Sequence, residues 1–279
     1  MKSSFIIFLL ITRLCFTQTL SDQQFGNEID TSLSKLIKMQ TEVSFIHPAL
    51  LNFYPIAFVQ GDSLYIYDYS KDEHMYKFIK QTPTPFPISE DIQASFPLSV
   101  YDNIPTCVAG KKIFNSLKGY TIIMHEFVHC WQAGTVEMEI KSELKIAQDA
   151  MAKQDYMWEL NHLFPYSDTL FVIHYKNFMD AIQNKEIDKA KSHRNKLKKY
   201  LSDIDFEYMV WQEWKEGTAR YVENKIQAHF LIDVNTNGKS EPFNRVLFYY
   251  GGALWANALI EADEKLLIEP MQLFNLMGD

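Results

Sequence analysis

Two histidines stand four residues apart, with a glutamate between them, in the segment IIMHEFVHCWQ, residues 122–132. On an α-helix, residues i and i+4 lie on one face, a turn apart, so His125 and His129 could direct two imidazole nitrogens at one metal ion. Zinc takes nitrogen and oxygen ligands tetrahedrally, and a catalytic site keeps one position for water. Glu126 is then placed to take a proton from that water. The segment predicts a hydrolytic zinc site that needs a third protein ligand.

The segment WQEWKEGTARYVENK, residues 211–225, is the best source of that ligand, because it places several glutamates on a second helical stretch. Glu216 is the predicted ligand, since the following Gly217 has no side chain to crowd a close neighbour. Glu213 is the leading substitute. Glu223, two turns beyond Glu216 on the same side, would either orient a ligand histidine or form a surface ion pair.

The motif pair HEFVHCW and WKEGTARYVE resembles that of the gluzincin metallopeptidases, especially the zinc aminopeptidases. The resemblance implies a zinc ion (Zn2+) held by His125, His129 and Glu216, with Glu126 as general base. It also implies a zincin-like catalytic core.

Gluzincins place a tyrosine, which donates a hydrogen bond to the oxyanion, in the sequence Y-x-x-G before a helix. FYYGGALWANALIE offers Tyr249, three residues before Gly252, and Tyr250 is the second choice. The chain departs from the family in two ways: a long stretch separates His129 from Glu216, and the aminopeptidase signature G-x-M-E-N is missing. The resemblance therefore supports the metal site better than it supports aminopeptidase specificity.

The elements that must position these residues are mostly helical. Apolar residues recur at helical spacing over most of the chain after about residue 119, and the motif helix is expected to span roughly 119–134. Further helical stretches are predicted at 22–52, 136–163, 168–200, 203–229, from near Gly252 onward, and in a short segment at the end of the chain. YPIAFVQGDSLYIYDYS, residues 54–70, predicts two strands around a turn at Gly61 and Asp62.

These elements predict a mainly α (α+β) fold. Residues 20–279 are expected to form a single catalytic domain, with a small N-terminal β element and a long helical insertion, about 136–200, between the two zinc motifs. The basic run at 189–200 is interpreted as a solvated helix face. With a formal net charge of −8, the chain is not expected to bind nucleic acid, because phosphate binding needs a concentrated basic surface.

Residues 1–19 are interpreted as a signal peptide, with Lys2 before an apolar run and cleavage near Thr17 or Thr19. A lipoprotein anchor at Cys15 is the less favoured alternative. The mature chain is expected to be secreted or periplasmic, with no transmembrane segment.

Two cysteines, Cys107 and Cys130, follow the predicted cleavage site. Export would allow them to pair, but the sequence leaves the disulfide open, since it does not give their separation. Trp131 is interpreted as a core residue. Surface or capping positions are expected for the remaining histidines of the helical region, His162, His174 and His193.

The sequence predicts a secreted zinc-dependent hydrolase, a peptidase that cleaves peptide or protein substrates with water activated by zinc and Glu126. The alternative is a non-catalytic exported protein that binds a peptide or glycan and carries a structural or vestigial metal site. A structural zinc site is closed by four protein ligands, and no obvious fourth ligand is present, which favours catalysis. Oligomeric state and the choice between endo- and exo-cleavage stay open.

Overall fold

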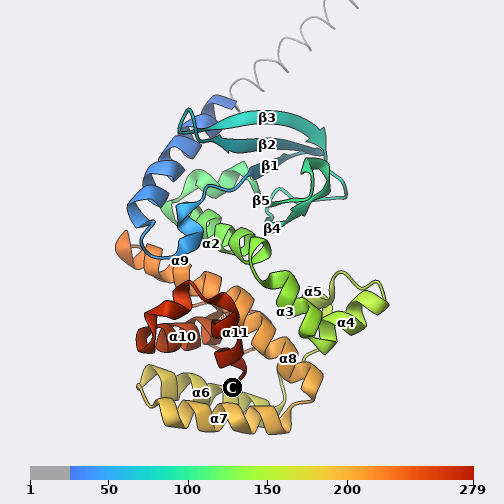
Figure 1. Ribbon diagram of the computed structural model, residues 1–279, viewed down its shortest axis with the longest axis vertical. Coiled ribbons are helices and arrows are strands. Elements are labelled where there is room, and N and C mark those ends of the chain that lie inside the picture. Colours follow the sequence, from blue (N-terminus) through green and yellow to red (C-terminus); the bar gives the residue numbers. More distant parts are fainter. Residues whose placement is uncertain (1–25) are drawn as a thin grey trace, which may run out of the picture.

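The computed structural model describes residues 26–279, so the predicted signal peptide, residues 1–19, and the alternative anchor at Cys15 lie outside the described residues. The fold is mainly α with one five-stranded mixed sheet, which agrees with the predicted α+β class. In Figure 1 the sheet lies at one end of the molecule and most helices lie at the other. Within the described part of the chain, no helix is both long and apolar enough to cross a membrane.

The elements follow the chain from an N-terminal helix at 26–43 to a C-terminal helix. The strands are β1 (Ile56–Gln60), β2 (Ser63–Ser70), β3 (Met75–Pro83), β4 (Gln93–Leu98) and β5 (Ile104–Gly110). The longer helices are α2 (Leu117–Gly134), α6 (Thr169–Gln183), α7 (Ile187–Tyr200), α8 (Asp203–Gln212), α9 (Thr218–His229) and α10 (Val246–Ala262). The shorter helices are α3 (Glu137–Glu143), α4 (Lys145–Ala152), α5 (Trp158–Asn161) and α11 (Pro270–Gly278).

The sheet has the strand order β3-β2-β1-β5-β4, in which only the β1–β5 pair is parallel. The two predicted strands are β1 and β2, and Gly61 takes the left-handed conformation, with φ of 56°, that their tight turn requires. β3, β4 and β5 were not predicted. β5 is buried over most of its length, so it lacks the alternation of apolar and polar residues that marks a half-exposed strand.

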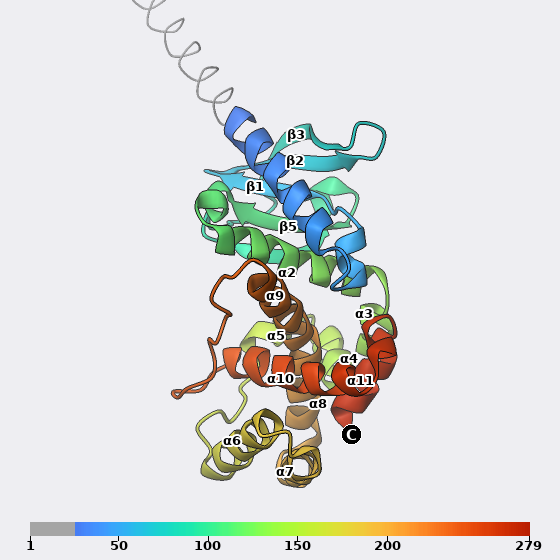
Figure 2. The same ribbon diagram turned by 90° about the vertical axis from the view of Figure 1, so that its left-hand side faces the viewer.

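Both faces of the sheet are covered, and β2 divides its side chains between them. Tyr65 and Tyr67 join the main core, to which the N-terminal helix and α2 contribute, whereas Leu64 and Ile66 join a smaller cluster on the opposite face. This agrees with the predicted alternation along the strand. Figure 2 shows the N-terminal helix and α2 crossing the same side of the sheet. The sheet therefore supports α2, the helix with the two candidate zinc ligands.

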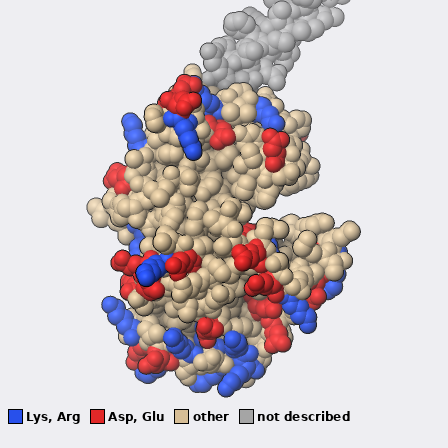
Figure 3. Space-filling view, in the orientation of Figure 1, with Lys and Arg blue, Asp and Glu red and all other residues tan. Residues whose placement is uncertain are grey.

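The region predicted as a helical insertion, about 136–200, is helical but more divided than expected. The stretch 136–163 contains α3, α4 and α5, and the stretch 168–200 is a hairpin of α6 and α7. The hairpin turns at Lys185, whose φ of 60° is left-handed and ends α6. On the face shown in Figure 3, a deep hollow lies between the end with the sheet and the region of α3–α5.

The basic run on α7 has the predicted solvated face, since its lysines are exposed. In Figure 3, basic side chains gather at the end of the molecule where α6 and α7 lie. Arg194 is the exception. It is fully buried and forms an ion pair with Glu213 at 2.8 Å.

The stretch predicted as one helix at 203–229 is α8 and α9 joined by a π-helical turn, Glu213–Gly217. α10 crosses this turn so closely that a Cβ atom on Gly252 would lie 2.5 Å from the carbonyl oxygen of Glu213. The expectation that the last long helix begins near Gly252 is therefore wrong. α10 begins at Val246, and Gly252 lies inside it because the crossing leaves no space for a side chain.

Replacement of Gly252 by alanine tests this crossing. We expect Gly252→Ala to lower the free energy of unfolding by about 1–3 kcal/mol, because the methyl group must displace backbone atoms of the π turn. Urea denaturation measures the change. Gly134→Ala is the matched control, since a Cβ there meets nothing within 4 Å. Equal stability of the two variants would contradict the close crossing.

Candidate metal centre

Three predicted ligands meet between α2 and the π turn. The Nε2 atoms of His125 and His129 lie 3.2 Å apart. Glu216 Oε2 lies 3.3 Å from His129 Nε2 and 3.8 Å from His125 Nε2. The two histidines are buried and Glu216 is half-buried. These three residues form a group that could hold a metal ion, as the sequence predicted.

The separations between these atoms fit a tetrahedral ion. Zinc binds imidazole nitrogen and carboxylate oxygen at about 2.0–2.2 Å, which places neighbouring ligand atoms of a tetrahedron about 3.3–3.5 Å apart. The three donor atoms lie at or near these separations without any change of fold. Among residues 26–279, no fourth His, Cys, Asp or Glu belongs to the group, so a tetrahedral ion held by these three residues would have one position for another ligand.

Glu216 reaches the histidines from the π turn, not from a regular α-helix. A π turn closes its hydrogen bonds between residues i and i+5, and such turns are frequent at functional sites. Gly217, next in the chain, lies against α10, where a Cβ would meet the Cα of Gly252 at 2.5 Å. The pair of glycines therefore lets α10 hold the π turn close to α2.

Each ligand histidine is oriented through its second ring nitrogen. His125 Nδ1 donates to Glu223 Oε2 at 3.1 Å, and His129 Nδ1 donates to Gln132 Oε1 at 2.9 Å. Gln132 in turn donates from Nε2 to the carbonyl oxygen of Lys215 at 3.2 Å, within the π turn. With Nδ1 as donor, the lone pair of each Nε2 is directed at the ion position.

The sequence allowed Glu223 either to orient a histidine or to form a surface ion pair, and in the structure it orients His125. It is buried, and beyond His125 its carboxylate accepts hydrogen bonds from Arg220 (3.0 Å), Gln227 (2.9 Å) and Asn235 (3.0 Å). Burial alone would raise its pKa, but the interactions with His125 and Arg220 lower the pKa of Glu223 to about 2. It is therefore a buried, ionised carboxylate and not part of a surface ion pair.

Protonation in the centre shows how strongly the site favours positive charge. Burial opposes a charged imidazole, yet hydrogen bonds to Glu216 and Glu223 raise the pKa of His125 to about 10. Burial likewise opposes a charged carboxylate, but the two histidines hold the pKa of Glu216 well below its usual range. A proton on the imidazole supplies the positive charge that a metal ion would supply, so metal and proton compete for the site.

Glu126, the predicted base, is buried on α2, and its Oε2 atom has no hydrogen-bond partner among the described residues. Its backbone carbonyl accepts a hydrogen bond from Ser95 Oγ at 2.9 Å, which fixes this part of α2 to the edge strand β4. A buried carboxylate oxygen without a partner is costly, and such groups persist where a ligand or water completes them. Glu126 is thus able to accept a proton beside His125.

The structure distinguishes the two tyrosines. Tyr249 is close enough to Glu216 for the carboxylate to perturb its hydroxyl, and its ring lies 5.5 and 5.2 Å from the guanidinium carbons of Arg220 and Arg245. Burial and the charge of Glu216 raise the pKa of Tyr249 far above its usual range, so its hydroxyl stays protonated and can donate.

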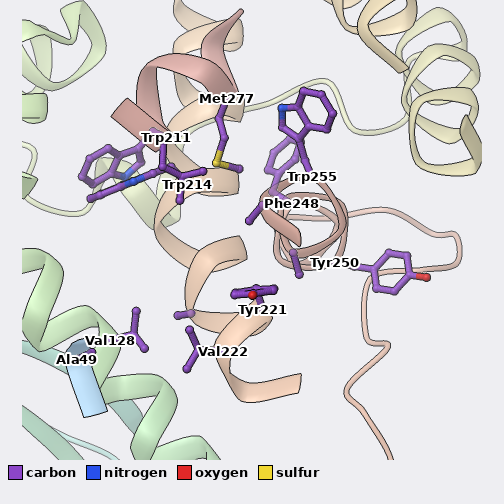
Figure 4. Close-up of a cluster of buried hydrophobic side chains, with 14 of the residues drawn as sticks. Ala49, Val128, Trp211, Trp214, Tyr221, Val222, Phe248, Tyr250, Trp255 and Met277 are labelled. Carbon is purple, nitrogen blue, oxygen red and sulfur yellow. The ribbon is translucent and has the colours of Figure 1, made fainter. Parts of the chain in front are cut away.

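Tyr250, the second choice for the oxyanion donor, points elsewhere. Its hydroxyl accepts a hydrogen bond from Gln183 Nε2 at 2.7 Å, on α6. Figure 4 shows its ring directed away from the helix that holds Tyr221. Tyr249 is therefore the tyrosine that the fold brings to the metal ligands.

Glu213, the substitute ligand, lies in the core and not at the metal centre. It accepts hydrogen bonds from Tyr175 Oη at 2.7 Å and Arg194 Nη2 at 2.8 Å. Close by, Trp211, Trp214, Phe248 and Trp255 belong to the main hydrophobic core (Figure 4). The carboxylate of Glu213 thus ties the π turn to α6 and α7.

The remaining residues singled out in the sequence lie outside the centre. Cys107 and Cys130 are both buried free thiols, so no disulfide joins them. Trp131 packs against the core, as expected. His162 is bonded to Asp205 at 2.8 Å, and the rings of His174 and His193 lie beside each other on α6 and α7.

Sequence reasoning missed several residues that complete the centre: Gln132, Arg220, Asn235 and Arg245. Gln132 could have been found, since it lies one helical turn beyond His129. Asn235 and Arg245 carry no such signal, because they belong to the connection between α9 and α10, whose path only the fold defines. Arg245 donates from Nη1 to Glu216 Oε1 at 3.3 Å and to Gln212 Oε1 at 3.4 Å.

Comparisons with protein-family models, with curated proteins and with solved structures found no match to this chain. The residues of the centre and their geometry are therefore the basis for any functional assignment.

Replacement of Glu223 tests the orientation of His125. We expect Glu223→Gln to weaken zinc binding about 10- to 100-fold. The neutral amide of glutamine replaces the ionised carboxylate that accepts the hydrogen bond from His125, so the imidazole is held less firmly. Competition with a chromophoric chelator measures the affinity. Glu264→Gln, at an exposed glutamate, is the control and should bind zinc as the wild type does. Unchanged zinc affinity in a folded Glu223→Gln protein would contradict the orienting function.

Proposed function

We propose that this protein is a zinc-dependent peptidase of the gluzincin type. The proposal rests above all on one observation: two imidazole nitrogens and a carboxylate oxygen lie at the separations of a tetrahedral zinc site. The neighbouring Glu126 and Tyr249 supply a proton acceptor and a proton donor at the same place. Together these groups match what hydrolysis of an amide requires.

His125, His129 and Glu216 would hold the ion. Bound there, zinc would polarise the substrate carbonyl and make a water molecule more acidic. Glu126 accepts the proton of the attacking water at its free carboxylate oxygen and passes it to the leaving amine. Tyr249 donates its hydroxyl hydrogen to the oxygen on which negative charge develops.

The surroundings of the centre support a zincin-like core. α2 packs against β4 and β5, and β4 is an edge strand of the sheet. A pocket of about 250 Å³ lies between Gln93 of β4 and Gly119 and Ile122 of α2. Ile122 is nearly one turn before His125 on the same helix.

A non-catalytic binding protein with a structural metal is the alternative. A structural zinc site is closed by four protein ligands, whereas the group found among residues 26–279 has three. The unpartnered oxygen of Glu126 also has no use in a purely structural site. Both observations favour catalysis.

We also propose that the protein is exported, with residues 1–19 as its signal peptide. This part of the proposal depends on the sequence alone.

Replacement of the base is the central test. We expect Glu126→Gln to bind about one zinc ion per chain, because the ligands are intact, and to lose about 10²- to 10⁴-fold in peptide hydrolysis. Metal analysis by mass spectrometry and a peptide-library digest measure the two properties. Glu139→Gln, at an exposed glutamate, is the control. Wild-type turnover in Glu126→Gln would rule out this base, and a wild-type protein that purifies without binding zinc would rule out the metal.

The oxyanion donor is tested by a matched tyrosine pair. Tyr249→Phe should lower kcat about 10²- to 10³-fold with zinc retained, because one hydrogen bond to the developing charge is lost. Tyr250→Phe loses only the contact with Gln183 and should hydrolyse peptides almost as the wild type does. Steady-state kinetics on the same peptide measures both. The reverse order of effects would assign the donor to Tyr250.

A further inference from the structure

Arg245 brings a guanidinium to the edge of the metal centre. It is the N-cap residue of α10, one turn before Tyr249, and its side chain is 28% exposed. Glu216 uses its two oxygens differently: Oε2 faces the histidines, and Oε1 faces Arg245 at 3.3 Å. The guanidinium therefore lies directly behind the ligand carboxylate and also reaches solvent.

Most of the hydrogen-bonding capacity of Arg245 is not used inside the protein. Only its Nη1 atom has acceptors among the described residues, Glu216 at 3.3 Å and Gln212 at 3.4 Å. Both contacts are longer than the roughly 2.7–2.9 Å of strong charge-assisted hydrogen bonds. The Nε and Nη2 atoms, with three further N–H groups, are left to bind something else.

The chemistry of these donors selects a carboxylate. A guanidinium presents parallel N–H groups in a planar fork that matches the two oxygens of a carboxylate. The stacking of its charged group over the ring of Tyr249, at 5.2 Å, limits its rotation and so holds the fork in place. A peptide substrate carries one carboxylate that does not depend on sequence, at its C-terminus.

We propose that Arg245 binds the C-terminal carboxylate of the substrate, so that the enzyme cleaves peptides at their carboxyl end. This inference rests on the proposed peptidase function. Arg245 lies within about 8 Å of the ion position, because the 3.3 Å contact with Glu216 adds to one carboxylate and one metal–oxygen bond. Since consecutive Cα atoms are about 3.8 Å apart, the cleaved bond is the last or the second-last of the chain.

The competing explanation is that Arg245 only holds the outer oxygen of Glu216. In that case its loss would weaken zinc binding and slow the cleavage of all peptides alike. Recognition of a carboxylate instead makes a specific difference between peptides that end in an acid and those that end in an amide. The ratio of the cleavage rate of free acids to that of amides therefore distinguishes the two explanations.

The test uses one randomised library of acetylated hexapeptides, synthesised once as free acids and once as C-terminal amides. With the zinc-loaded wild type, we expect mass spectrometry to find cleavage at the last or second-last bond. The free acids should be cleaved about 10- to 100-fold faster than the amides, in keeping with a hydrogen-bonded charge pair.

Arg245→Met should remove this preference for free acids. Arg245→Lys, which keeps the charge but lacks the planar fork, should keep part of it. Lys239→Met, at an exposed lysine before α10, is the matched control and should keep all of it.

A binding measurement gives a second readout that does not require turnover. Calorimetry with the zinc-loaded Glu126→Gln protein should show about 10- to 100-fold tighter binding of the best-cleaved peptide as an acid than as an amide. The difference should vanish when Arg245→Met is added, with thermal melting used to verify that the variant is folded.

The possible failures are distinct. Cleavage of both libraries at equal rates, or internal cleavage that ignores the C-terminus, overturns the carboxylate assignment and leaves the peptidase proposal intact. Equal loss of acid and amide cleavage in Arg245→Met, together with weaker zinc binding, also overturns the carboxylate assignment. It would mean that Arg245 only holds the outer oxygen of Glu216. A zinc-loaded wild type that cleaves neither library overturns the peptidase proposal, and the inference about Arg245 with it.

Discussion

The contact between Glu216 and the two imidazoles of α2 is the interaction on which the other features of this protein depend. It joins a carboxylate and two histidines that are far apart in the chain, and it requires all three to lie away from bulk water. Burial of such groups is favourable only where each has a partner. The sheet that supports α2 and the glycine crossing that holds the π turn both serve to keep this contact in place.

A set of buried charges extends from this contact into the helical region. Lys215, beside Glu216, forms ion pairs with Glu137 at 2.9 Å and Glu159 at 3.4 Å, on α3 and α5. Burial would lower the pKa of Lys215, but these carboxylates raise it above its usual range, so the ammonium stays charged. The backbone carbonyl of the same lysine accepts the hydrogen bond from Gln132 that orients His129. The helices between the two predicted zinc motifs are therefore tied to the candidate ligands themselves.

The local part of this arrangement could be predicted from the sequence, and the long-range part could not. His125 and His129 belong to one helix, so their spacing alone predicts that they converge. Glu216 was predictable because its surroundings resemble a known motif and because Gly217 signals a close neighbour. The start of α10 was predicted wrongly, since a glycine that permits a helix crossing looks the same in sequence as one at a helix boundary. β5 was missed because it is buried over most of its length and so lacks the alternation of a half-exposed strand. Arg245 was missed because only the path of the preceding loop brings it to Glu216.

The π turn sets the angle between the residues on either side of it, and so links the candidate centre to the packing of α9. A π turn closes its hydrogen bonds between residues i and i+5, so it holds one residue more than an α-helical turn of the same helix. Loss of one residue between Gln212 and Thr218 would let α8 and α9 merge into a regular helix and would rotate one relative to the other by about 100°. Glu216 and the glutamate that orients His125 could then no longer both face α2. The same rotation would turn the buried residues of α9, among them Ala219, Val222 and Ile226, away from the core, so the candidate centre and the packing of α9 depend on the same turn.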